Sequence, residues 1–539
     1  MPRSDYDYII VGAGSSGCVI AERLSAEASN RVLLLEAGPP DRYPWIHVPI
    51  GYGKTMFHPR LNWGYRTEPE SNVAERSIYW PRGKTLGGSS AINGLVYIRG
   101  QHQDFDDWAA AGNPGWSWQD VLPLFRRSEC QMRGADAYHG ADGPLAVSDV
   151  GEADELCDAF IAGGEEVGFP RNDDFNGADQ EGVGYFQLTT RNGRRCSTAV
   201  AFLRGARHRD NLDIVTEADC ERVIIESGRA TGVSYRRGGE LVTAGCRGEV
   251  ILSAGAINTP KLLELSGVGN PAILEQTGIK TLHALPQVGE NLQDHLQVRV
   301  IMRCTRPITT NDDLHSWYRS ARIGLRYVLQ RRGPLAVGIN KAGGFVRSRP
   351  GLARPDIQFH FGTLSSDIPG SPVHDFPGFT LSTCQLRPES RGSVHLRSAD
   401  AGDDPAIHPN YLATEEDRRV AVDGVRVSRR IAASNAMRPY VAAEYSPGEA
   451  VQSDDELLDF VRRDGTTIFH PVGTCRMGSD ASAVVDPELR VRGIGGLRVA
   501  DCSIMPTLVS GNTNAAAIMI GEKASDLLLA AREDRAMAS

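Results

Sequence analysis

A cluster of three glycines near the start of the chain limits its fold more than any other feature of the sequence. The apolar run Tyr8–Val11 leads directly into Gly12-Ala-Gly14-Ser-Ser-Gly17. Such a run followed by glycines is typical of a buried parallel strand that turns sharply into a helix, here predicted over residues 15–24. Gly12 permits the turn, Gly14 lets the backbone approach a pyrophosphate, and Gly17 allows the helix to pack closely on the strand. The N-terminus of that helix would then face the anion.

A second apolar run, Val32–Leu35, ends in an acidic residue, Glu36. Glu36 follows Gly17 at a spacing of about 20 residues, at which a carboxylate can accept a hydrogen bond from a ribose 2′-hydroxyl. The same carboxylate would repel a 2′-phosphate, so the pattern disfavours NADP. Strand, helix and acid together predict a Rossmann-like dinucleotide site, with a glycine-rich loop of an ordinary α/β protein as the alternative. The pattern alone does not separate FAD from NAD.

Two further segments point to redox chemistry at that site. The segment Gly87-Gly88-Ser89-Ser90 presents small side chains and adjacent backbone amides, which suit close approach to a phosphate chain or a flavin. His470 begins a distant His-Pro-Val-Gly segment, and Pro471 restricts it to an extended backbone. An imidazole with an ordinary pKa of about 6.5 is an available base near neutral pH. We therefore predict an oxidoreductase in which His470 reaches a bound dinucleotide.

Composition and charge exclude several other classes of function. The 539 residues exceed the usual size of one hydrophobic core, which predicts two domains. The net charge of −9 is spread along the chain without a basic stripe, so no nucleic-acid partner is expected. The ten cysteines form no Cys-x-x-Cys pair. They indicate reduced thiols rather than a disulfide framework or a zinc site, and no metal is expected.

The sequence also bears on location. The first predicted strand begins within about seven residues of the N-terminus, which leaves no room for a cleavable signal. No apolar stretch is long enough to span a bilayer. We expect a cytoplasmic protein without a transmembrane segment. Peripheral attachment to the inner membrane stays open, because a hydrophobic entrance loop can provide it without a visible anchor.

Longer motifs resemble the glucose–methanol–choline (GMC) oxidoreductase family of flavoenzymes. Residues 83–93 are similar to the first family signature, and residues 255–269 are similar to the second. Within the family, bacterial choline-dehydrogenase-like and aliphatic alcohol dehydrogenases are the most similar. Further family-like positions and segments are Tyr97, Gly100, Asp106, 291–295, 470–478 and 499–506.

The resemblance implies an α/β fold (α+β overall). In it, a Rossmann-like FAD-binding domain is interleaved with an antiparallel-sheet substrate-binding domain. The FAD-binding domain is expected from residues 1–150, 201–300 and 475–539. The substrate-binding domain is expected from residues 151–200 and 301–474.

Local patterns are compatible with this organisation. The aromatic-rich segment 43–63 is expected to be a loop near the active-site entrance, where it serves either as a substrate lid or in domain packing. Residues 356–361 alternate in polarity and predict a half-buried strand. Further strands are predicted over residues 211–215, 220–225 and 250–253, and a helix over about 515–531.

The resemblance also implies which residues contact FAD. Certain choline-oxidising relatives have, at the position of Ile92, a histidine bonded covalently to the flavin. Isoleucine cannot form that bond, so non-covalent FAD is expected. Val223 resembles the backbone position that reads adenine, and Asn93 would meet the isoalloxazine edge. Asp501 would act through its backbone N–H or a ribityl contact, because a pyrophosphate would repel its carboxylate. The expected cofactor-binding residues are Gly12, Gly14, Ser15, Ser16, Gly17, Glu36, Ala37, Gly87, Ser89, Asn93, Gly94, Val223, Ala500, Asp501, Asn512 and Thr513.

The activity implied by the family is oxidation of a primary alcohol, aliphatic or aryl, to the aldehyde. His470 would remove the hydroxyl proton while a hydride passes to flavin N5. Asn512 resembles the second active-site residue, which is His or Asn in other members, and its amide would donate to the substrate oxygen. Asn514 is expected to cap the last helix or to touch the cofactor. The electron acceptor is oxygen or a quinone, and the sequence does not separate the two.

Three other activities stay open. A choline-type amino alcohol dehydrogenase would need an aromatic cage and a carboxylate for the quaternary ammonium group, which the sequence alone does not assemble. The family also includes flavin-bearing hydroxynitrile lyases, which do no net redox chemistry, and light-driven fatty acid decarboxylases. The presence of both His470 and Asn512 favours alcohol oxidation over the last two.

Overall fold

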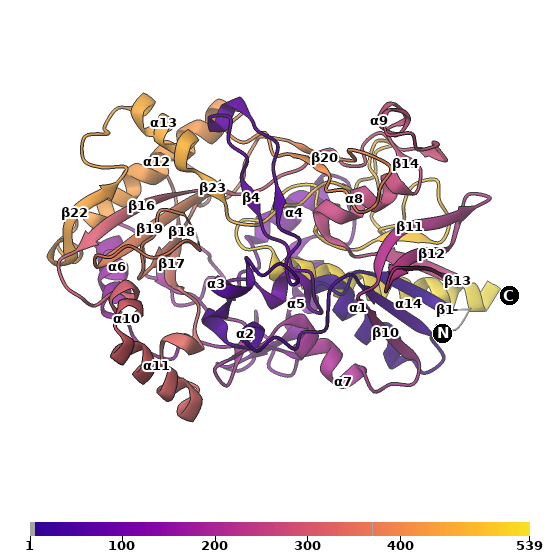
Figure 1. Cartoon of the computed structure of the whole chain (residues 1–539), viewed down its shortest axis with the longest axis horizontal. Helices are drawn as coiled ribbons and strands as arrows, with labels where there is room; N and C mark the ends of the chain where they lie inside the picture. The colour runs from indigo at the N-terminus through magenta and orange to yellow at the C-terminus, as the bar shows by residue number, and fades with distance from the viewer. Residues whose placement is uncertain (1–5, 369, 539) are drawn as a thin grey trace.

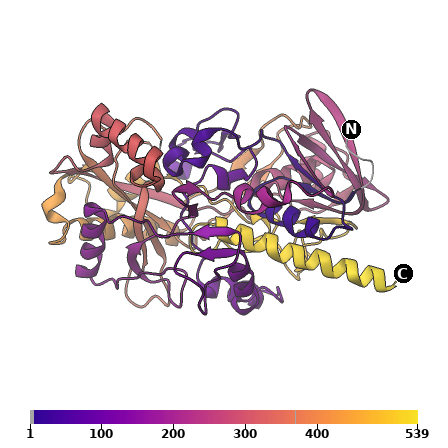
Figure 2. The ribbon, with the colours of Figure 1, turned by 90° about the horizontal axis from the view of Figure 1, so that it is seen from below.

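The computed structural model describes residues 6–368 and 370–538 and contains two seven-stranded sheets at opposite ends of its long axis (Figure 1). Helix α14 (Asn514–Ala538) starts near the middle of the molecule and runs toward the end that holds the first sheet (Figure 2). Helices and sheets alternate along the chain, as expected for the predicted α/β class.

The first sheet contains the glycine fingerprint. Its strand order is β10 (Leu212–Thr216), β2 (Val32–Glu36), β1 (Tyr6–Val11), β13 (Glu240–Leu252), β12 (Arg229–Arg237) and β11 (Asp219–Glu226), with β24 (Leu497–Val499) also paired to β13. Strands β10, β2, β1, β13 and β24 pair in parallel, and β13, β12 and β11 pair antiparallel. All of β2 and nearly all of β1 is buried, as parallel strands covered on both faces require. The strands predicted over 211–215, 220–225 and 250–253 are confirmed as β10, β11 and the end of β13.

Helix α1 (Ser15–Ala26) packs against this sheet at a contact where only glycine fits. A Cβ on Gly17 would lie 1.9 Å from the carbonyl oxygen of Gly12. Helix α14 packs along α1, and Ser15 Oγ donates to Asn514 Oδ1 at 2.7 Å. The fingerprint loop and the N-terminus of α14 are therefore neighbours, although they lie at opposite ends of the sequence.

The second sheet is antiparallel throughout. Its order is β22 (Val441–Ser446), β16 (Leu296–Cys304), β19 (Gly378–Gln385), β18 (Ile357–Gly362), β17 (Asn340–Val346) and β7 (Gly182–Tyr185), with β23 (Thr466–Thr467) also paired to β16. Strands of the two sheets alternate along the chain. The domain boundary predicted at residue 300 falls inside β16.

The two faces of the second sheet differ in chemistry, but both are buried. On β18, Phe359 and Phe361 pack against Phe160 of α6 (Glu155–Glu166), with ring centroids 5.8 and 4.7 Å away. The intervening side chains Gln358 and His360 are also buried, although the pattern predicted a half-buried strand. That prediction was right about the strand and wrong about its burial, because the other half of the molecule covers the polar face.

The segment 43–63, predicted to be a loop, is partly helical. It contains three short helices: α2 (Pro44–His47), η1 (Pro49–Gly51) and α3 (Tyr52–Thr55). Pro44 and Pro49 each occupy a first-turn position, where the missing backbone N–H breaks no helical hydrogen bond.

The remaining elements connect or cover the two sheets. The helices are α4 (His102–Ala110), α5 (Trp118–Ser128), α7 (Arg204–Ala206), α8 (Gly255–Leu265), α9 (Pro271–Gln276), α10 (Thr310–His315), α11 (Trp317–Gln330), α12 (Glu415–Ala432) and α13 (Asp454–Asp464). The short strands are β3 (Tyr65–Arg66), β4 (Tyr79–Trp80), β5 (Glu129–Gln131), β6 (Leu145–Val147), β8 (Thr190–Arg191), β9 (Arg194–Arg195), β14 (Val268–Gly269), β15 (His283–Ala284), β20 (Ser393–His395) and β21 (Ala406–His408). Across the two described ranges, no helix has both the length and the hydropathy needed to cross a bilayer.

The α1 contact generates a stability prediction. Gly17→Ala places a methyl group against the Gly12 carbonyl oxygen, which forces α1 away from the sheet. We expect a loss of about 1–3 kcal/mol in the free energy of unfolding, measured as a lower melting temperature. Gly205→Ala in α7 is the matched control, because its added Cβ would meet no atom within 4 Å. Equal melting temperatures for the two variants would contradict this account of the packing.

Candidate active site

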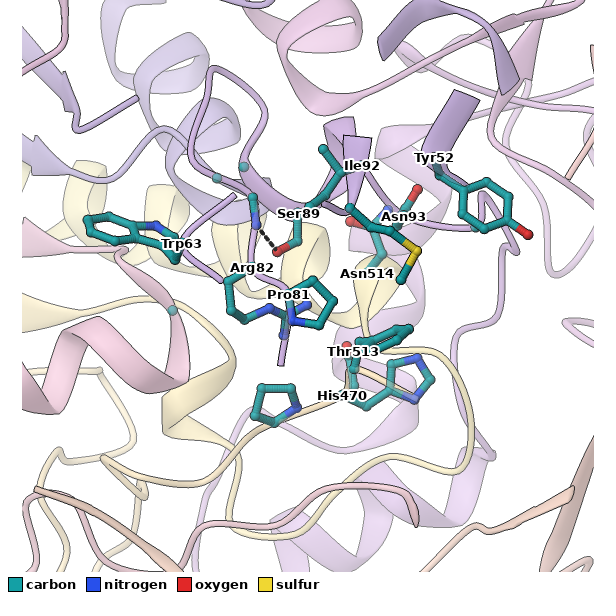
Figure 3. A pocket seen from close by; sticks show the side chains of 18 of the residues that line it. Tyr52, Trp63, Pro81, Arg82, Ser89, Ile92, Asn93, His470, Thr513 and Asn514 are labelled. Carbon is teal, nitrogen blue, oxygen red and sulfur yellow. Dashed lines mark hydrogen bonds between the residues drawn. The ribbon is translucent and has the colours of Figure 1, made fainter. Parts of the chain in front are cut away.

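A cavity of about 640 Å³ lies between the two sheets (Figure 3). Its first wall is formed by the carboxyl ends of β1, β2 and β13 and by the two glycine-rich segments. Its opposite wall includes residues of β16, β17, β18 and β19. The segments 468–471 and 512–514 complete the lining where the two halves meet. Ligands of open α/β sheets bind in the crevice at the carboxyl ends of the strands, so the cavity lies where a cofactor is expected.

The two glycine segments are in contact at this cavity. A Cβ on Gly88 would lie 2.7 Å from the Cα of Gly14, and the N–H of Gly87 donates to the carbonyl of Ala13 at 2.8 Å. Gly87 and Gly88 both have positive φ, +89° and +52°, which favours glycine. The backbones of the two glycine segments are therefore accessible at one surface, with no side chain between the segments.

Glu36 lines the cavity at the end of β2. Its carboxylate accepts the N–H of Ala13 at 3.0 Å and the N–H of Gly38 at 2.9 Å. Burial raises the pKa of Glu36 to about 7. Through these two hydrogen bonds the carboxylate stabilises the fingerprint turn, and a group bound in the cavity can still reach it.

Most of the predicted site residues meet at the cavity. Gly17, Gly87 and Ala500 do not line it, and Gly17 and Gly87 act in packing instead. The predicted residues that line it are Gly12, Gly14, Ser15, Ser16, Glu36, Ala37, Ser89, Asn93, Gly94, His470, Asp501, Asn512 and Thr513.

Val223 is not brought to the cavity. Its N–H donates to Ser266 Oγ at 2.8 Å, so this backbone donor is already used inside the protein. The β11 segment that lines the cavity is Ala218–Cys220, which sequence reasoning missed. One register irregularity in β11, between Cys220 and Arg222, separates Cys220 from Val223. Val223, expected to contact the cofactor, therefore does not line the cavity, whereas Cys220 does.

Asp501 uses its carboxylate within the protein. It accepts from the N–H of Gly255 at 2.8 Å, from Thr259 Oγ1 at 2.6 Å and from the N–H of Ser503 at 2.8 Å. Burial raises the pKa of Asp501, and these hydrogen bonds oppose the rise. The carboxylate anchors the start of α8, a role that needs no contact with a phosphate.

A hydrogen-bond chain fixes the tautomer of His470. His295 Nε2 lies 2.9 Å from the carbonyl oxygen of Leu386, which can only accept, so Nε2 carries the proton. His295 Nδ1 is then an acceptor, because burial lowers the pKa of His295 to about 4 and its ring is neutral. His470 Nδ1 lies 2.9 Å from that acceptor and must donate to it. The Nε2 atom of His470 is therefore unprotonated and carries a lone pair.

Asn512 forms a hydrogen bond with that lone pair. Its Nδ2 lies 3.2 Å from His470 Nε2 and donates to it, while its Oδ1 accepts from Gln358 Nε2 at 3.0 Å. The amide orientation follows from the His470 tautomer, because an acceptor at Nε2 requires a donor opposite it. A hydroxyl placed beside the two groups can donate to the imidazole and accept from the amide.

His470 is held neutral by its surroundings. Burial, and then the neighbouring His295, His360 and Arg82, lower the pKa of His470 well below 6.5. Figure 3 shows the imidazole close to Thr513, across the cavity from Ile92 and Asn93. The ring is thus available as a base throughout the neutral range.

Asp294 fixes the backbone on which His470 is carried. Its carboxylate accepts the N–H of His470 at 2.7 Å, the hydroxyl of Thr467 at 2.6 Å and the hydroxyl of Tyr411. Between these anchors, Phe469 adopts φ +73°, a conformation that costs a non-glycine residue free energy. The structure therefore stores strain next to the candidate base.

Sequence reasoning missed four residues of this centre: His295, Gln358, His360 and Arg82. His295 lies within the family-like segment 291–295, which was the available signal, although no role was assigned to it. Gln358 and His360 occupy the polar positions of an alternating strand, and their alternation was interpreted as solvent exposure.

The cavity fits a flavin dinucleotide. The Gly14–Gly88 contact leaves a side-chain-free cradle in which an added Cβ on Gly88 would collide with the Gly14 backbone. On the cavity wall, Nε of Arg82 is buried without a hydrogen-bond partner, which suits a ligand rich in acceptor atoms. Ile92, with an aliphatic side chain, also lines the cavity.

Comparison with known proteins agrees with this geometry. Two family models, both described as GMC oxidoreductase, match residues 6–297 and 388–521. An alcohol dehydrogenase [acceptor] of Pseudomonas putida is 47% identical over 528 residues, covering 97% of this chain and 96% of the relative. The mitochondrial choline dehydrogenase of Mus musculus is 44% identical over 540 residues, covering 98% and 90%.

Solved structures give the same result. Pyridoxine 4-oxidase from Mesorbium loti is similar with a TM-score of 0.88 and 32% identity, over 97% of this chain and 98% of that one. The chain is thus an FAD-dependent oxidoreductase acting on CH–OH donors, and it belongs to the GMC oxidoreductase family.

Proposed function

We propose that this enzyme oxidises an uncharged primary alcohol, aliphatic or aryl, to the aldehyde, with His470 as the base and Asn512 as the donor to the substrate oxygen. The observation that carries the proposal is the unprotonated Nε2 of His470, whose lone pair faces the Asn512 amide and is fixed by the hydrogen bonds through His295 to Leu386. The resemblance to an alcohol dehydrogenase [acceptor] supports it.

The part of the cavity next to the first sheet would hold FAD without a covalent bond. The glycine cradle suits the pyrophosphate, and the N-terminus of α1 faces it. Ile92 offers no nucleophile to the flavin. Residues proposed to contact the cofactor are Gly12, Gly14, Ser15, Ser16, Glu36, Ala37, Arg82, Ser89, Asn93, Gly94, Cys220, Asp501, Asn512 and Thr513.

FAD, when bound, supplies the acceptor for the hydride that leaves the carbinol carbon. The side chains of this chain supply the base and the alignment. Asn512 Nδ2 donates to the hydroxyl oxygen, and His470 Nε2 takes the hydroxyl proton. His295 acts as a positioning residue, because it keeps the His470 proton on Nδ1. Asp294 keeps the His470 backbone in place.

The positions of the carboxylates on the cavity wall disfavour a quaternary ammonium substrate. The carboxylates among the described lining residues are Glu36, Asp219 and Asp501, all on the side of the first sheet. The lining of the opposite side includes apolar side chains such as Leu335 and Ile339. A quaternary ammonium group would therefore lack a counter-charge there. The choline dehydrogenases at 43–44% identity nevertheless make a choline-type alcohol the second candidate.

The proposal predicts bleaching of the flavin on anaerobic mixing with aliphatic or aryl alcohols, but not with choline. His470→Ala should retain FAD and slow flavin reduction by about 100- to 10,000-fold, because the base is lost. The exposed His208→Ala is the matched control and should leave the rate unchanged. Stopped-flow absorbance gives the rates, and readmitting air separates oxygen from a quinone as acceptor.

Two outcomes would replace this proposal. Cleavage of a cyanohydrin with the flavin oxidised throughout would identify a lyase, and light-dependent loss of carbon dioxide from a fatty acid would identify a decarboxylase. Reduction by choline alone would establish the second candidate.

The tautomer chain generates a separate prediction about pH. Because the pKa of His470 lies well below 6.5, the rate of flavin reduction should stay constant as the pH is lowered through 6.5. His295→Phe removes the acceptor for the Nδ1 proton and should lower that plateau by about 10- to 100-fold. His295→Gln keeps an acceptor and a donor, and it should recover much of the loss. A His295→Phe rate equal to that of the wild type would exclude the positioning role.

The cradle generates a prediction about cofactor content. Gly88→Ala places a methyl group against Gly14 at positive φ, so we expect less bound FAD, read as a lower ratio of flavin to protein absorbance. Gly53→Ala is the control, because Gly53 lines the same cavity and its added Cβ would meet no atom within 4 Å. Full flavin content in Gly88→Ala would contradict the proposed cradle.

A further inference from the structure

Helix α11 exposes a stripe of apolar side chains on the protein surface. The stripe is formed by Trp317, Ala321, Leu325 and Val328, which recur at intervals of three and four residues and so share one helical face. Trp317 is 82% exposed, Leu325 60% and Val328 66%. An amphipathic helix of a globular protein normally buries this face. Within α11, Tyr327 is the buried side chain.

The exposed apolar surface continues beyond the N-terminus of α11. Leu314 of the preceding helix α10 is exposed, and Tyr318 and Leu329 of α11 widen the surface. Both views place α10 and α11 at the periphery of the molecule, beside the second sheet (Figures 1 and 2). The name α11 stripe is used below for Trp317, Ala321, Leu325 and Val328.

Basic side chains flank the α11 stripe, although the chain carries a net charge of −9. Arg322 and Arg332 are exposed, and among the described residues no carboxylate lies within salt-bridge distance of either, although the charge of Arg322 opposes the rise in the pKa of Asp313. Arg331 lies over the ring of Tyr327 at 5.0 Å, and Arg326 pairs with Glu152 at 2.6 Å. An exposed apolar stripe with tryptophan at one end and arginines beside it is the arrangement of a helix that lies in the interface of an anionic membrane.

The α11 stripe begins next to the cavity. Leu314 of α10 is exposed and also lines the cavity, and Leu335 of the 3₁₀ helix η5 (Pro334–Ala336) lines it on the other side of α11. Any surface that binds the α11 stripe would therefore lie next to the wall of the active site.

We propose that the α11 stripe docks this enzyme on an anionic phospholipid bilayer, with the apolar side chains among the acyl chains and the arginines at the headgroups. A second copy of the chain fits the stripe less well. Arg322 is near the middle of α11, so a two-fold axis through the helix would bring two unpaired guanidinium groups together. Anionic lipid, in contrast, supplies the missing counter-charge.

The test is co-sedimentation of the full-length holoenzyme with vesicles of phosphatidylcholine alone, or with an equal amount of phosphatidylglycerol. We expect binding to the anionic vesicles that weakens with salt. Trp317→Ser/Leu325→Ser/Val328→Ser should bind more than about tenfold more weakly. Arg322→Gln/Arg332→Gln should bind about 25-fold more weakly, because each arginine near the surface contributes about fivefold. Neither variant alters a residue that lines the cavity.

The matched controls change the same kinds of residue elsewhere. Met132→Ser/Leu241→Ser/Leu282→Ser removes three exposed apolar side chains, and Arg237→Gln/Arg463→Gln removes two exposed charges. Both should bind as the wild type does. In addition, brominated acyl chains should quench tryptophan fluorescence in the wild type and less in Trp317→Phe.

Three results would overturn the proposal. These are no binding to anionic vesicles, equal binding by the stripe variant and its control, or a wild-type dimer in sedimentation equilibrium that the stripe variant dissociates. The last result would assign the stripe to a second copy of the chain. Vesicle binding is measured without alcohol or acceptor, so its failure leaves the proposed alcohol oxidation standing, and the reverse also holds.

Discussion

One continuous hydrogen-bond chain links the two halves of the molecule at the active site. It runs from the Leu386 carbonyl through His295 and His470 to Asn512 and ends at Gln358. Both ends lie on or beside the second sheet, and Asn512 precedes α14, which packs on the first sheet. Each donor in the chain is determined by its neighbour, starting from a carbonyl that can only accept. The proposed base therefore depends on both halves being docked.

The glycine fingerprint could be predicted from the sequence because its constraints are local. Gly12, Gly14 and Gly17 are separated by two and three positions, and the turn they form needs only adjacent backbone. The position that reads adenine could not be predicted in the same way. An irregularity in the pairing of β11 lies between Cys220, which lines the cavity, and Val223, which does not, and nothing in the order of residues shows where a strand changes register.

The burial of β18 shows a second limit. Alternation of Gln358 and His360 with Phe359 and Phe361 correctly predicted a strand with two unlike faces. Alternation does not show what covers the polar face, and here the other half of the molecule covers it. For the same reason, His295 as the partner of His470 Nδ1 and Gln358 as the partner of Asn512 could not be assigned from the sequence, because each lies more than a hundred residues from the side chain it contacts and meets it only after the two sheets dock.

The two faces of the second sheet also differ in role: one contributes to the stability of the fold, and the other to specificity for the substrate. Side chains facing α6, such as Phe359 and Phe361, form the core, while alternate positions such as His360, Thr380 and Ser382 face the cavity. A substitution at a cavity-facing position changes the shape available to the substrate and leaves the packing behind the sheet intact. Relatives that share this scaffold can therefore diverge in the alcohols they accept, one strand position at a time, without rebuilding the half that holds the cofactor.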